Sequence, residues 1–226
     1  MKRKLCRLFL CPLLLLGSTM PMVATASVVN VATGQTSVLL DTGVLSSVGL
    51  DVSGVSSDVI APGNLGADSV AFAINSRSAT PPLLPTTFSY TPGTLVPFSG
   101  AIEHVGSVFF NADSIEVGNF TIGYDASRVG VDTSGFFVES TIGVMAILFD
   151  VATPSLLAPE ESSLTIGADL LVSSEFANFL GNADLTGADV GDALVEAGVP
   201  VPATLALLGL GIAGIGYRRR KQIKAE

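Results

Sequence analysis

Apolar and β-branched residues occur in short runs after residue 26, and Gly, Asp, Asn, Ser and Pro separate these runs. A period of two between apolar positions predicts a strand with one buried face. This pattern predicts strands at 48–52, 70–74 and 163–172. The last of these is the most regular, and its inward positions are Leu164, Ile166, Ala168, Leu170 and Val172.

Three further segments depart from simple alternation. Residues 114–124 are interpreted either as a hairpin with its turn at Gly118 and Asn119, which we favour slightly, or as one strand with a bulge at Gly118. In residues 143–151, apolar side chains occupy both the odd and the even positions, which indicates a central strand covered on both faces. Residues 76–97 contain five prolines, so we expect mostly loop there, with a brief strand at 87–90.

The body contains one short helical signal. Residues 174–180 are expected to form one or two helical turns, with Ser173 or Ser174 as the cap and Gly181 as the stop. The acidic segment 182–193 is expected to be a last edge strand or a spacer. Many short strands without crossover helices predict one all-β domain at 27–198, an antiparallel β-sandwich or jelly roll.

The first 26 residues have the three parts of a secretory signal peptide. A basic start reaches Arg7, an apolar run covers 8–16, and small residues follow at Ala24 and Ala26. The apolar run is too short to span the roughly 30 Å of a bilayer core. We therefore expect export through the Sec translocon and cleavage by signal peptidase after Ala26.

Charge is distributed unevenly along the chain. The formal net charge is -9, but between Ser27 and Gly198 two cations, Arg77 and Arg128, stand against 19 carboxylates, which gives -17. So acidic a body repels nucleic-acid phosphates, and nucleic acid is excluded as a partner. Both cysteines lie within the predicted signal peptide, so the mature body has no disulfide and no thiolate metal site.

The C-terminal segment 199–226 has a different pattern. Residues 203–217 are fifteen residues without a charge, which make about 22 Å of helix. A cationic cluster follows at 218–224. This order predicts one short transmembrane helix, with the cations on the cytoplasmic side and the body outside.

This tail resembles the PEP-CTERM sorting signal of Gram-negative bacteria. The matching residues are Pro200, Pro202, Ala203, Arg218, Arg219 and Arg220. Val201 stands where the family most often has glutamate, so the tail is nearest to the Val-Pro-x-Pro-Ala variants. The resemblance implies recognition and cleavage by an exosortase, after which an inner-membrane-anchored intermediate becomes a surface, secreted or biofilm-matrix protein. The resemblance implies where the protein is sent and implies no activity for the body, because such tails follow many unrelated bodies.

The body offers no catalytic constellation. His104 is the only histidine, and the chain has no Gly-x-Ser-x-Gly elbow, so we interpret His104 as structural and predict no catalytic residues. Carboxylate pairs for glycoside hydrolysis are a weak signal among 19 acids, in a body without tryptophan. We therefore predict that the protein is not an enzyme.

Acidic loops raise the question of calcium. The candidate oxygen ligands are Asp184, Asp189 and Asp192, or Asp125 with Asp132. They do not follow the Asp-x-Asp-x-Asp-Gly register, so we assign no metal site and no cofactor, with calcium kept as an alternative.

The sequence thus predicts an exported, non-enzymatic surface or extracellular-matrix protein. The alternative is a calcium- or carbohydrate-binding adhesion module with extracellular polysaccharide as a partner. A secreted glycoside hydrolase is the third and least favoured interpretation.

Overall fold

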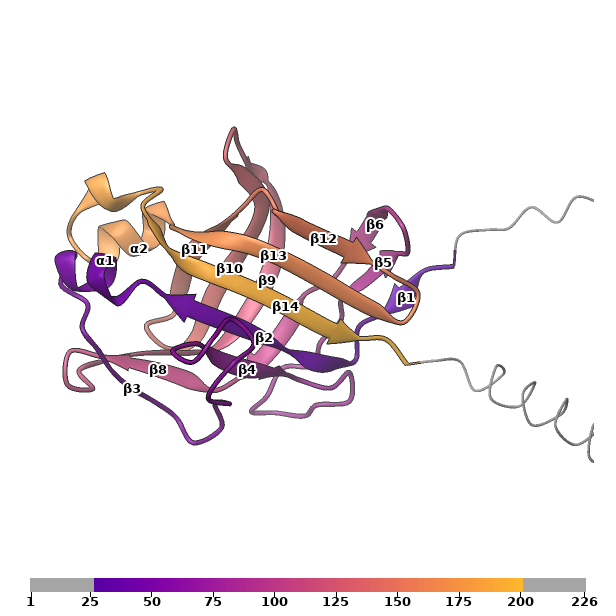
Figure 1. The fold of residues 1–226 in the computed structure, drawn as a ribbon, viewed down its shortest axis with the longest axis horizontal. Coiled ribbons are helices and arrows are strands. Elements are labelled where there is room, and N and C mark those ends of the chain that lie inside the picture. Colours follow the sequence, from indigo (N-terminus) through magenta and orange to yellow (C-terminus); the bar gives the residue numbers. More distant parts are fainter. Residues whose placement is uncertain (1–26, 201–226) are drawn as a thin grey trace, which may run out of the picture.

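A computed structural model of the chain describes residues 27–200, and Figure 1 shows its fold. Nearly all of its regular structure is strand. The strands are β1 (Val29–Asn30), β2 (Thr33–Leu40), β3 (Val52–Val55), β4 (Val70–Ile74), β5 (Ser89–Thr91), β6 (Leu95–Ser99), β7 (Ile102–Val105), β8 (Ser107–Phe110), β9 (Ile115–Val129), β10 (Thr133–Gly143), β11 (Ala146–Ala152), β12 (Leu156–Pro159), β13 (Ser163–Val172) and β14 (Asp189–Gly198). The helices are α1 (Thr42–Ser47), α2 (Ser174–Phe179) and the 3-10 helix η1 (Ala183–Leu185).

Eight of the strands form a sheet that closes on itself. Their order is β9, β10, β11, β13, β14, β2, β4 and β7, after which β7 pairs with β9 again. Every pairing is antiparallel. The strand β9 closes the ring because its 15 residues pair with β10 along one edge and with β7 and β8 along the other.

The all-β antiparallel class is confirmed, and the predicted β-sandwich or jelly roll is wrong. A sandwich buries apolar side chains between two stacked sheets. In this protein the inward-facing residues of eight strands of one closed sheet point into a common interior. Period-two alternation is the same in both architectures, because each strand needs one buried face in either case.

The remaining strands extend or cover the closed sheet. β3 pairs with β8, β12 pairs with β13, and β1, β5 and β6 form a separate three-stranded sheet. Figure 1 shows α1 and α2 at one end of the closed sheet and β1, β5 and β6 at the other. α2 packs on β11, where Leu148 is fully buried beside the inward-facing Phe149.

Four local predictions are confirmed. β13 has the predicted bounds and buries the five predicted residues, and β4 matches the strand at 70–74. β11 is covered on both faces at Leu148 and Phe149, although it begins at Ala146 because residues 144–145 connect it to β10. The helix begins after Ser173, whose hydroxyl accepts a hydrogen bond from the N–H of Phe176 at 3.0 Å.

Three local predictions are wrong. The favoured hairpin at 114–124 is wrong, and the alternative of a single strand is correct, because β9 runs from Ile115 through this segment. The irregular residue is Asn119, whose φ of 46° turns Phe120 to the same inward face as Val117. Residues 48–52 do not form one strand: Val48 caps α1, and β3 begins at Val52. Within the segment 182–193, residues 189–193 are neither an edge strand nor a spacer, since they belong to β14, which lies between β13 and β2.

The two predicted membrane-targeting segments lie outside the described residues. These are the signal peptide at 1–26 and the helix at 203–217. Within residues 27–200, the structure contains no helix with the length and apolar character needed to cross a membrane.

Candidate functional site

The C-terminal tail begins where the last strand ends, with no spacer between them. Gly198 pairs with Thr33 of β2 and with Ser163 of β13. The N–H of Ala32 donates to the carbonyl of Gly198 at 3.1 Å, and the N–H of Val199 donates to that of Ser162 at 3.0 Å. Pro200 is exposed. The body is therefore held by hydrogen bonds up to the residue that precedes the first proline of the tail.

A tyrosine hydroxyl ties the neighbouring turn to the rest of the fold. Tyr90 of β5 is fully buried, and its hydroxyl lies 2.6 Å from the carbonyl oxygen of Glu160 and 2.8 Å from that of Ser163. Burial, and then the charge of Glu160, raise the pKa of Tyr90, so the hydroxyl remains a donor. Because Ser163 pairs with Gly198, this contact supports the strand pair from which the tail leaves.

An aromatic cluster fills the same end of the closed sheet. Phe98 lies 5.2 Å from Phe136 and 4.9 Å from Tyr124, measured between ring centroids. Phe88 lies 5.9 Å from Phe98 and 6.3 Å from Tyr90. These five residues, here called the aromatic cluster, close the interior next to the point where the chain enters and leaves the body.

The sorting residues are described only at Pro200. The other predicted residues of the signals lie outside the described part of the chain. They are Val201, Pro202, Ala203, Arg218, Arg219 and Arg220 in the tail, and Ala24 and Ala26 in the signal peptide.

His104 is buried and held by two hydrogen bonds. Its Nδ1 lies 3.0 Å from the carbonyl oxygen of Phe120, which accepts only, so Nδ1 carries the proton. Its Nε2 then accepts from the hydroxyl of Thr36 at 2.7 Å. Burial lowers the pKa of His104 to about 4, and the bond to Phe120 opposes this shift. The imidazole is neutral at pH 7 and joins β7 to β2 and β9.

Acidic side chains meet in a different combination from the one expected. Asp169 of β13 stands directly opposite Asp192 of β14, and both are exposed. Burial, followed by the charges of Asp169 and Asp189, raises the pKa of Asp192. Asp184 lies apart from this pair, in η1.

Asp125, from the second candidate set of calcium ligands, is held by local hydrogen bonds. The carboxylate of Asp125 accepts from the N–H and the hydroxyl of Ser127, each at 2.8 Å. Across residues 27–200, no three Asp, Glu, His or Cys side chains are grouped so as to hold a metal ion.

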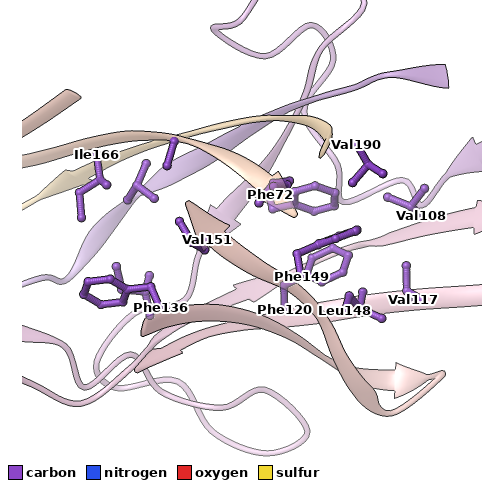
Figure 2. Close-up of a cluster of buried hydrophobic side chains, with 14 of the residues drawn as sticks. Phe72, Val108, Val117, Phe120, Phe136, Leu148, Phe149, Val151, Ile166 and Val190 are labelled. Atoms are coloured by element: carbon purple, nitrogen blue, oxygen red, sulfur yellow. The ribbon is translucent and has the colours of Figure 1, made fainter. Parts of the chain in front are cut away.

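The interior of the closed sheet contains an apolar cavity of about 80 Å³. All eight strands contribute to its walls, and Figure 2 shows part of the lining. On one side Phe72 meets Phe120 edge to face, with ring centroids 4.8 Å apart. At about 24 cal/mol per Å³, an empty cavity of this volume costs roughly 2 kcal/mol of stability.

Sequence reasoning missed this cavity. Ala168 was predicted to face inward, but its partner across the strand pair, Ala193 of β14, was placed in an edge strand or spacer. The structure sets these two alanines directly opposite each other, and both line the cavity. The signal that would find such a site is the pairing register of β13 and β14, which single-strand alternation does not contain.

Comparison with known proteins finds a distant structural similarity for the body and a sequence-motif match for the tail. The described fold is similar to the C-terminal domain of HtaA from Corynebacterium glutamicum, with 13% sequence identity, a TM-score of 0.45, and coverage of 76% of this chain and 99% of that domain. Among curated proteins no significant match was found. Residues 198–221 match the PEP-CTERM protein-sorting motif. The chain therefore carries a PEP-CTERM sorting motif that begins at the last residue of β14.

Proposed function

We propose that this protein is exported and sorted to the cell surface or extracellular matrix by an exosortase, and that its β-sheet body acts there without catalysing a reaction. The sorting motif at 198–221 is the observation that carries the proposal. The Sec translocon and signal peptidase act first, with cleavage after Ala26. The helix at 203–217 then holds the chain in the inner membrane until the exosortase acts.

The position of the motif restricts how the intermediate sits at the membrane. Gly198 is fixed in the sheet, and Ala203 begins the predicted membrane helix only five residues later. Five extended residues span at most about 18 Å. The end of the body that carries β1, β5 and the aromatic cluster therefore faces the membrane surface, within reach of a membrane-embedded processing enzyme.

The composition of the body supports this route. A charge of -17 between Ser27 and Gly198 repels anionic lipid headgroups, so the body stays in solution while the tail anchors it. His104 carries the one imidazole of the chain, and it is neutral and buried. This imidazole is therefore not accessible to act as a general acid or base on a substrate. These features favour a structural or binding role over catalysis.

The proposal is tested by fractionating cells that produce three forms of the chain. One is the natural chain, one ends at Pro200, and one carries Arg218→Lys, Arg219→Lys and Arg220→Lys. The natural and lysine forms are expected at the surface or in the medium, because both keep the cationic cluster. The form ending at Pro200 is expected in the periplasm, exported but unsorted. Equal distribution of all forms, or cytoplasmic recovery, would contradict the proposal.

A further inference from the structure

The middle of the closed sheet is incompletely filled, because it contains the apolar cavity. Protein interiors normally leave few voids larger than a water molecule. Here six apolar residues of the cavity wall remain partly exposed although the sheet closes around them: Val38, Leu40, Val70, Ile122, Val138 and Ala193. These residues line the cavity and are less completely buried than the other apolar residues of its wall.

The cavity owes its space to a pair of small residues. Ala168 and Ala193 stand opposite each other on β13 and β14, whereas the next inward positions along these strands are Ile166, Leu170 and Val195. A larger residue at either alanine would fill the cavity with its own side chain. The small side chains of Ala168 and Ala193 thus leave a space, whereas the larger side chains at the next inward positions fill theirs.

The chemistry of the walls determines what the cavity accepts. The lining residues are apolar apart from Thr36 and His104, and these two bond to each other. A buried water needs two to four polar partners, and an ion in such surroundings loses its hydration without compensation. An uncharged apolar molecule meets neither penalty.

We propose that this cavity is a binding site for a compact, uncharged apolar ligand, an alkyl group of a few carbon atoms. An engineered cavity of about 150 Å³ with similar walls binds benzene or xenon, and the present cavity has about half that volume. The alkyl group belongs either to a free small molecule or to the end of a lipid chain, and the experiment distinguishes these sources.

Xenon is the probe for the site. The full chain is placed in lipid nanodiscs, and methyl NMR spectra are recorded at increasing xenon pressure. Saturable shifts are expected at the methyl groups of Ala168, Val151 and Ile166, which line the cavity. Ala193→Leu is expected to abolish these shifts, whereas Ala73→Leu, on the outer face of β4, leaves them unchanged.

A second variant and a second measurement complete the test. Ala168→Leu fills the space from the other strand, so it serves if Ala193→Leu fails to fold. Native mass spectrometry of the natural chain is expected to show an added mass that the filled variants lack. A mass of lipid size identifies a membrane source, and a smaller mass identifies a free molecule. The proposal is overturned if the cavity methyl groups do not respond to xenon, or if they respond equally in the filled variants.

Discussion

The two parts of the interior differ in how they are filled. At the end where the tail leaves, the aromatic cluster packs ring against ring, and the Tyr90 hydroxyl is bonded to two carbonyl oxygens. In the middle, Ala168 and Ala193 lie side by side on the paired strands β13 and β14 and line an apolar cavity. The same closed sheet supports both, and the aromatic cluster lies at the end where the last strand leads into the PEP-CTERM tail.

Truncating the aromatic cluster should have the largest effect. Phe88 is 1% exposed and contacts three other rings of the cluster. Phe88→Ala is expected to lower the free energy of unfolding by about 3–5 kcal/mol, because it removes buried carbon and leaves a second cavity. Chemical denaturation measures the loss. Phe179→Ala, at a residue that is 51% exposed, is the control and should change stability little. Equal losses would show that the cluster is not the tightly packed end.

Acid should weaken the fold through His104. The pKa of His104 is about 4 in the folded protein against 6.5 when unfolded. Between pH 4 and pH 6.5, His104 is protonated in the unfolded chain but not in the folded chain. The contribution of His104 to the free energy of unfolding is therefore fully present above pH 6.5 and is lost as the pH falls toward 4. The loss amounts to roughly 3 kcal/mol.

A neutral replacement isolates this effect. His104→Gln keeps a donor and an acceptor but does not titrate in this range, so its stability should depend less on pH. Glu103, whose pKa is raised by burial, acts in the opposite direction in both proteins and cancels in the difference. Parallel pH profiles from 6.5 to 4 would show that His104 is not buried as a neutral group.

Removing the tyrosine hydroxyl should have a smaller, local effect. Tyr90→Phe keeps the ring in the aromatic cluster but removes the donor to Glu160 and Ser163. A loss of about 1–2 kcal/mol is expected. Hydrogen exchange should accelerate around Ser163 and Gly198 before it does so in β10. Uniform acceleration throughout the sheet would argue against a local role in holding the last strand.

Filling the cavity should have the smallest effect and the opposite sign. Ala193→Leu is expected to raise the free energy of unfolding by about 1 kcal/mol, as cavity-filling substitutions commonly do. Ala73→Leu on the outer face is the matched control. Overpacking typically costs 1–3 kcal/mol, so a loss of that size in Ala193→Leu alone would show that the middle of the sheet has no free space.

The sequence predicts best those elements whose cause is local. β13 and α2 were found because Leu164 to Val172 alternate without interruption and Ser173 caps the helix. A turn was favoured at Gly118 and Asn119 because the spacing of Val117 and Phe120 breaks the alternation of a regular strand. In the structure, the positive φ of Asn119 places both side chains on the same face within one continuous strand.

Ring closure and the cavity were not predictable in this way. Closure of the sheet requires β9 to pair with β10 on one edge and with β7 on the other. It also requires β2 to pair with β14, which brings Thr33 opposite Gly198, 165 residues later in the chain. The cavity requires the register that opposes Ala168 to Ala193. Both depend on pairings between distant segments, which alternation within one strand does not encode. The sorting motif was predictable because its signal is contained in one contiguous segment.

Intact-mass spectrometry of the mature protein, from the cells that make it, tests directly whether the tail is removed. We predict a chain that begins at Ser27 and ends near Pro200, because the sheet holds Gly198 and the motif begins there. A mature chain that still ends at Glu226, or one cut within β14, would contradict it.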